Sequence, residues 1–114
     1  MTPMMNTQLT ITSLMKHAEQ INGAVEVVSV TADNPCHRYT YREAFGRVRQ
    51  LANVLAELGL EPGDTIATFA WNDYRHLEIY YAVSCSGMIC HTINPRLFPE
   101  QIEYIVNHGQ DKWI

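Results

Sequence analysis

The stretch that decides the fold is GDTIATFAWNDYRHLEIYYAVSCSGMICHTINPRL, residues 63–97. Its two short apolar runs, residues 65–70 and 88–92, predict strands, and residues 73–86 between them predict a helix that is apolar nearly all round. A strand, a helix and a second strand in this order are typical of a βαβ unit with a parallel sheet. The polar loop 93–97 follows the second strand, where such sheets place functional residues.

Two amphipathic helices are expected before this unit. Apolar residues at helical spacing predict the first over residues 10–21, with Thr10 or Thr12 as its cap. Thr40, followed three residues later by Glu43, fits a capping box that opens the second helix. The apolar stripe of that second helix comprises Tyr41, Phe45, Val48, Leu51, Ala52, Leu55 and Leu58.

The remaining segments predict a hairpin, a last helix and a third strand. β-branched residues in residues 25–30 predict a strand, and residues 38–41 are its expected return strand across a turn at 33–35. We expect this hairpin to lie outside the main parallel sheet. Pro99 opens the last helix, and residues 111–114 are the expected start of a third strand.

The predicted fold class is therefore α/β: the N-terminal part of a mostly parallel βαβ sheet domain plus a small β-hairpin. We expect residues 1–9 to be disordered and residues 10–114 to form the start of a larger domain. A strand that begins at Trp113 leaves apolar surface and backbone groups unpaired, so we expect the domain to be incomplete and truncated.

The composition of the 114 residues is that of a soluble globular protein, with 46% apolar and 18% charged residues. The net charge is −4, and no cluster of basic residues favours nucleic acid or an anionic membrane as a partner. No apolar span approaches the roughly 20 residues of a membrane helix, and the N-terminus lacks a signal pattern. We expect a soluble, cytoplasmic protein.

The three cysteines favour a structural role, and so do the arginines of the second helix. Cys36, Cys85 and Cys90 are odd in number and lack a CxxC spacing, so they predict reduced core thiols. The arginines are interspersed with glutamates and predict a solvated face: Arg42, Arg47 and Arg49.

Four runs in a fixed order carry a family resemblance: YTYRE at 39–43, LGLEPGDTIA at 58–67, NDYRHLE at 72–78 and HTINPRLF at 91–98. Together they resemble the N-terminal segment of the adenylate-forming acyl-CoA synthetases, the AMP-binding superfamily. The first two patterns occur across that superfamily. The last two are narrower and are similar to medium-chain fatty-acyl-CoA ligases and methylmercaptopropionate-CoA ligases.

The resemblance implies what a full-length relative does. It would use ATP and Mg²⁺ to convert a fatty or short- to medium-chain carboxylic acid into an acyl-adenylate, and then transfer the acyl group to coenzyme A. Residues 10–114 would be the N-terminal portion of its large AMP-binding domain. The family commonly dimerises, so a homodimer is one expected assembly.

The motifs that carry the chemistry of this family have no match here. There is no Ser/Thr/Gly-rich phosphate loop, and Lys16 and Lys112 do not fit the motif of the catalytic lysine. We therefore assign no catalytic residue and no metal ligand. We expect this chain alone to perform neither half-reaction and to bind none of the cofactors tightly.

The candidate site residues are His91, Asn94 and Arg96. They would line a substrate or CoA channel, or contact a second subunit; alternatively, Asn94 and Arg96 hydrogen-bond neighbouring loops and hold the strand end, which we favour. An arginine fork suits either role. For His91 we favour a core histidine over a catalytic base, because the sequence places no carboxylate or nucleophile near it.

Other polar residues are interpreted structurally. We expect Trp71 and Tyr74 to be packing residues. A metal site is disfavoured because the spacing matches no common zinc pattern for the set His76, Glu78, His91 and His108.

Two other classes of function stay open. One is a non-catalytic, stand-alone interaction module or degenerate ligase remnant that pairs through the exposed edge at Trp113. The other is a small flavodoxin-like or receiver-type binding domain. That second class is disfavoured because neither paired acidic residues nor a phosphate loop follow the strands.

Overall fold

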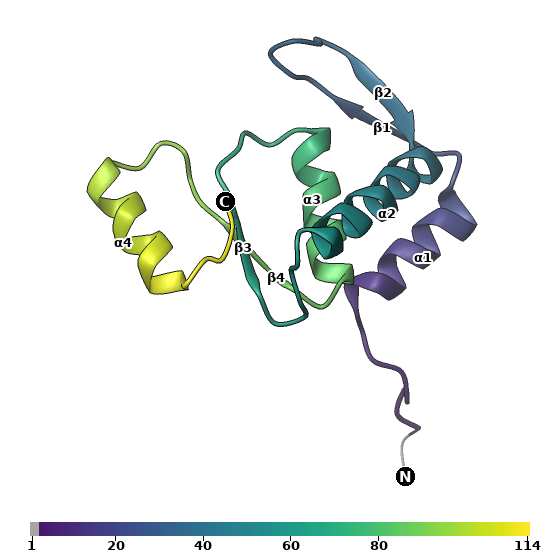
Figure 1. Ribbon diagram of the computed structural model, residues 1–114. Coiled ribbons are helices and arrows are strands. Elements are labelled where there is room, and N and C mark those ends of the chain that lie inside the picture. Colours follow the sequence, from purple (N-terminus) through teal and green to yellow (C-terminus); the bar gives the residue numbers. More distant parts are fainter. Residues whose placement is uncertain (1–2) are drawn as a thin grey trace.

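The computed structural model describes residues 3–114 and has the predicted α/β architecture (Figure 1). Helices and strands alternate after an initial helix and a hairpin, so the fold class expected from the sequence is confirmed. In chain order the elements are α1 (Ile11–Asn22), β1 (Glu26–Ser29), β2 (His37–Thr40), α2 (Tyr41–Glu57), β3 (Thr65–Thr68), α3 (Tyr74–Cys85), β4 (Ile89–Thr92) and α4 (Pro99–Gly109).

Side-chain caps fix where the first three helices begin. The Thr10 hydroxyl caps α1. Thr40 and Glu43 form both halves of the predicted capping box of α2, and Asp73 caps α3 by accepting from the backbone N–H of His76 at 3.0 Å. Each cap satisfies backbone donors that have no partner within the helix.

The hairpin is separate from the main sheet, as predicted. β1 and β2 pair antiparallel, with Glu26 opposite Thr40. β2 runs directly into α2, because Thr40 is both the last strand residue and the helix cap. Beyond the strand ladder, the backbone N–H of Tyr41 donates to the carbonyl of Val25 at 3.0 Å.

The main sheet is parallel and centres on β3. Ile66 lies opposite Cys90 of β4 on one side and forms an isolated parallel bridge with Trp113 on the other. The bridge rests on two backbone hydrogen bonds, both 2.8 Å long: Lys112 donates to Thr65, and Ala67 donates to Trp113. The expected strand at 111–114 is thus one bridge rather than a ladder.

The core fills the space between α1, α2, α3 and one face of the sheet. Ala82 and Val83 are neighbours in α3 and both fully buried, yet they pack into different clusters. α3 is therefore buried on more than one side, as its nearly all-round apolar sequence requires. The first cluster comprises Met15, Phe45, Val48 and Ala82, and the second comprises Leu60, Ile66, Val83 and Met88.

α4 lies across β3 and β4 from the other helices (Figure 1). It contains no fully buried residue, and its apolar residues Ile102, Ile105 and Val106 are only half-buried. The helix ends with Gln110 in the left-handed region, at φ 54°. Gly109 is the last helical residue, and a Cβ there would lie 2.9 Å from the His91 ring.

The cysteines differ in part from the prediction. All three are free, but Cys36 is exposed; it follows the hairpin turn, where its backbone N–H donates to the Asn34 side chain at 3.1 Å. The expectation of a core thiol is therefore wrong for Cys36, while Cys85 and Cys90 are half-buried. Among the described residues, no helix is long and apolar enough to cross a bilayer.

Candidate functional site

A pocket of about 460 Å³ lies at the carboxyl ends of β3 and β4. Its walls are the β3–α3 loop at 70–72, the α3 residues His76 and Tyr80, and residues 92–96 after β4. Parallel sheets commonly bind ligands at this end, because the loops that follow the strands converge there. The pocket is therefore the candidate binding site.

Arg96 lines this pocket, and its guanidinium has no carboxylate partner among residues 3–114. The Asn94 side chain accepts a hydrogen bond from the backbone N–H of Arg96 at 2.9 Å and so fixes the loop. The Arg96 guanidinium lies 5.5 Å from the centre of the Trp71 ring, a cation–π distance. It forms no ion pair with any residue in the described range 3–114. Such a guanidinium is free to meet a phosphate or a carboxylate.

His76 lies between this pocket and a second hollow of about 660 Å³ on the other side of the β3–α3 loop. Its Nε2 lies 2.8 Å from the Thr68 hydroxyl, and its ring stacks on Tyr80. The His76 side chain thus ties the start of α3 to the end of β3. Within residues 3–114, no group of three or more His, Cys, Asp or Glu side chains converges as metal ligands would.

His91 does not line the pocket and has a partner that the sequence did not indicate. Its Nδ1 lies 2.8 Å and 3.0 Å from the two carboxylate oxygens of Asp111, whose side chain is fully buried. The expectation that no carboxylate lies near His91 is therefore wrong. One feature could have indicated this pair. The chain from α4 to Trp113 has to pass β4 to reach the far edge of β3, which brings Asp111 close to β4.

A second polar network, also not anticipated, joins α2, α3 and β2. The buried Glu78 carboxylate receives two bonds from Arg47, at 2.7 and 3.2 Å, and one from the Tyr39 hydroxyl at 3.1 Å. Burial and the neighbouring Glu78 charge raise the pKa of Tyr39 well above its ordinary value. Arg47 is therefore a cross-helix anchor and not only part of a solvated face.

Arg49 also crosses between helices. It pairs with Glu19 of α1, and this contact holds the pKa of Glu19 below its ordinary value. Both arginines remain about half-exposed, so the sequence placed them correctly at the surface but missed their partners. These networks hold the helices together, and neither lies in the candidate pocket.

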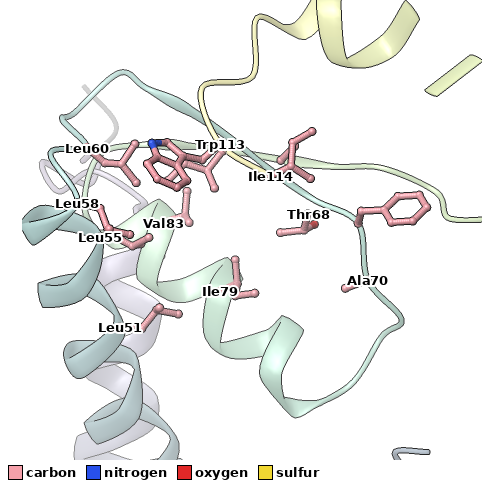
Figure 2. A pocket seen from close by; sticks show the side chains of 13 residues that line it. Leu51, Leu55, Leu58, Leu60, Thr68, Ala70, Ile79, Val83, Trp113 and Ile114 are labelled. Carbon is pink, nitrogen blue, oxygen red and sulfur yellow. The ribbon is translucent and has the colours of Figure 1, made fainter. Parts of the chain in front are cut away.

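An apolar groove of about 330 Å³ is a third hollow, shown in Figure 2. No charged side chain lines it. Thr68 is the lining residue that carries a hydroxyl, and this hydroxyl is already hydrogen-bonded to His76. The walls come from α2, α3, β3 and the last two residues, with Leu51, Leu55, Leu58, Ile79, Val83, Trp113 and Ile114 among them.

The fold combines a parallel β3–β4 sheet with a candidate ligand pocket at the strand ends. The sequence pattern of the AMP-binding enzyme family matches residues 14–114. The chain belongs to the AMP-binding enzyme family, which confirms the resemblance read from its four motifs.

Two relatives show how far the similarity extends. A medium-chain-fatty-acid–CoA ligase of Ectopseudomonas oleovorans is 55% identical over 97% of this chain and 20% of its own length. A 3-methylmercaptopropionyl-CoA ligase of Ruegeria lacuscaerulensis is 51% identical over 96% of the chain and 20% of its own. The chain thus spans about a fifth of the length of these relatives.

Solved structures share the fold. An acyl-CoA synthetase of Brucella canis superposes with a TM-score of 0.79 at 16% identity, covering 91% of this chain and 19% of that one. The anthranilate CoA ligase AuaEII, in complex with anthranoyl-AMP, gives a TM-score of 0.77 at 19% identity with the same coverage of both chains. At these identities the likeness supports the fold alone.

Proposed function

We propose that this chain is the N-terminal portion of the large domain of an ATP-dependent acid–CoA ligase. The observation that carries the proposal is 55% identity, over 97% of the chain, to a medium-chain-fatty-acid–CoA ligase. The complete enzyme would convert a fatty or short- to medium-chain carboxylic acid into an acyl-adenylate and then into an acyl-CoA. Three free cysteines support a reducing, cytoplasmic location.

We expect the groups that hold ATP and Mg²⁺ to lie outside residues 1–114. No metal-ligating cluster converges within residues 3–114, and the sequence contains no glycine-rich phosphate loop. Those groups would come from the other four fifths of a chain as long as the relatives. We therefore expect residues 1–114 alone to perform neither half-reaction.

The part that this chain would play is to form one wall of the substrate or CoA channel. Arg96 and Asn94 carry that role, because the pocket at the strand ends holds a guanidinium that lies next to the Trp71 ring and has no ion-pair partner among residues 3–114. Arg96 would attract the carboxylate of the acid or a phosphate of CoA. His91 lies outside the pocket and would support the strand behind this wall.

The test is a chimera in which residues 1–114 replace the matching segment of the Ectopseudomonas oleovorans ligase. We expect a chimera that folds, as judged by circular dichroism and gel filtration, to form acyl-CoA from a medium-chain fatty acid. A folded but inactive chimera would contradict the proposal. In purified residues 1–114, ATP–pyrophosphate exchange and thioester formation should both be absent.

The chimera also tests the role of the pocket. Arg96→Met should raise KM for the acid or for CoA about tenfold, the loss of one charge-assisted contact, with kcat less affected. The matched control is Arg38→Met, which removes an exposed arginine paired with Glu26 in the hairpin and should leave both constants unchanged. Equal effects of the two substitutions would contradict a channel role for Arg96.

A second candidate function is a non-catalytic interaction module. The apolar groove favours it, because Trp113 and Ile114 are 45% and 67% exposed beside it. Light scattering of residues 1–114 separates the two proposals. Concentration-dependent association beyond a homodimer supports the module, whereas a monodisperse monomer argues against it.

A further inference from the structure

The segment 110–114 has to cross from the α4 side of β4 to the far edge of β3. Gln110 redirects the chain through the left-handed region. Two backbone hydrogen bonds join the segment to β3: Lys112 donates to Thr65, and Ala67 donates to the carbonyl of Trp113. Because so short a pairing is weak by itself, side-chain contacts have to determine where the segment lies.

The contact between His91 and Asp111 is the buried one. The Asp111 side chain has no exposed surface, and its only side-chain hydrogen-bond partner among the described residues is the His91 ring, at 2.8 and 3.0 Å. A buried carboxylate is tolerated only when a donor faces it. A carboxylate accepts hydrogen bonds, so His91 can serve as the donor only with a hydrogen on Nδ1.

The backbone around Asp111 is shaped to fit the imidazole. A Cβ on Gly109 would lie 2.9 Å from both Cε1 and Nδ1 of His91, closer than such atoms approach one another. The glycine therefore lets the end of α4 reach the ring that Asp111 contacts. Residues on both sides of Gln110 thus touch the same imidazole, one by packing and one by hydrogen bonding.

A second ion pair in the segment is much more exposed. Lys112 Nζ lies 2.8 Å from the Asp64 carboxylate, but the lysine side chain is 47% exposed. Solvated pairs of this kind contribute little. The buried pair is accordingly the contact that distinguishes the seated segment from a displaced one.

We propose that His91 and Asp111 form a latch that seats residues 111–114 against β3 and thereby builds one wall of the apolar groove. Trp113 and Ile114 are that wall (Figure 2). Releasing the latch would free Trp113 and widen the groove, while α1, α2, α3 and the hairpin stay packed. His91 and Asp111 are positioning residues in this role and touch no reacting group.

The test uses the chain in a Trp71→Phe background, so that Trp113 is its only tryptophan. His91→Leu leaves the Asp111 carboxylate buried without a donor. We expect red-shifted Trp113 emission and at least about tenfold faster hydrogen exchange at the amides of Ala67 and Lys112, because local opening becomes easier. Amides of the hairpin should keep their exchange rates. The control, Lys112→Met, should change the Ala67 exchange rate less than about twofold.

Two further measurements cover the case in which His91→Leu unfolds the whole chain. The double variant His91→Leu with Asp111→Leu removes the unpaired carboxylate and should restore hairpin protection. In the unaltered chain, ¹⁵N NMR of the neutral imidazole should show the Nδ1–H tautomer for His91. The Nε2–H tautomer, or unchanged Trp113 emission and Ala67 exchange in a folded His91→Leu variant, would overturn the latch.

Discussion

The two faces of the β3–β4 sheet are held in different ways. On the side of α1, α2 and α3, Phe45, Ala82 and Val83 have almost no exposed surface, and the Arg47–Glu78 pair links two of the helices. On the side of α4, no helix residue is fully buried. The first face is stabilised by close packing within the chain, while the second depends on a few specific polar contacts.

The two faces of the sheet therefore contribute unequally to the free energy of unfolding. Burial of apolar surface contributes in proportion to area, so the helical side supplies most of the free energy of unfolding. The α4 side adds little area, and its position is set by contacts that act on single residues. Substitutions on the two faces should therefore differ in how much they lower the free energy of unfolding and in how many residues they affect.

The largest effect should come from the helical face. Phe45→Ala removes a ring that is 1% exposed and packs edge-to-face on Tyr81, and it should lower the free energy of unfolding by about 3–5 kcal/mol. Ile105→Ala, on the half-buried face of α4, should cost only about 1 kcal/mol. Urea unfolding followed by circular dichroism measures both; similar losses would refute the contrast between the faces.

The polar link on the helical face should rank second. Arg47→Met leaves the buried Glu78 carboxylate with only the Tyr39 hydroxyl, and it should cost about 1–3 kcal/mol, since Arg47 itself is half-exposed. The comparison variant is Arg38→Met, whose pair with Glu26 is more than half-exposed on both sides and is worth below about 1 kcal/mol. Urea unfolding measures both variants. The midpoint should be lower for Arg47→Met than for Arg38→Met, and the reverse order would contradict the prediction.

Two glycines that differ in their surroundings sharpen the comparison further. Gly109→Ala places a Cβ 2.9 Å from the His91 ring and should cost about 1 kcal/mol through overpacking. Gly46→Ala in α2 meets nothing within 4 Å and should gain about 0.5–1 kcal/mol from helix propensity. Thermal unfolding of both variants is the measurement, and a stabilising Gly109→Ala would show that the α4 end is not tightly fitted.

The smallest effect concerns the Tyr39 hydroxyl and should appear only at alkaline pH. Burial and the Glu78 charge raise the pKa of Tyr39 in the folded chain above its ordinary value near 10. The unfolded chain therefore releases this proton first, so the stability contribution is complete below about pH 10 and is lost as the pH rises beyond it. Urea midpoints across that range should fall more steeply for the parent chain than for Tyr39→Phe. Tyr104→Phe, at a 65% exposed position, should leave the slope unchanged.

The sequence predicted the elements because each has a local signal. The capping box at Thr40 and Glu43, for example, depends on residues only three positions apart. The α/β class followed from the order of these elements. Strand ends were less accurate: β3 stops at Thr68, two residues early, because Phe69 has no described strand residue opposite it.

The pairings between distant residues could not be read from the sequence. Glu78 and Arg47 are 31 positions apart, and His91 and Asp111 are 20 apart. No spacing rule indicates which charges meet across helices or strands. For the candidate site, the sequence pointed to Asn94 and Arg96, and the structure adds the neighbouring Trp71 ring and the pocket between them. It could not show that His91 lies outside this pocket.

The joint between the hairpin and α2 has a mechanical consequence. Thr40 ends β2 and caps α2, and backbone bonds from Tyr41 to Val25 and from Arg42 to Gly23 brace the same corner, at 3.0 and 3.1 Å. No flexible linker residue remains to absorb bending. The direction of the hairpin is therefore set by the start of α2, and the two should move together.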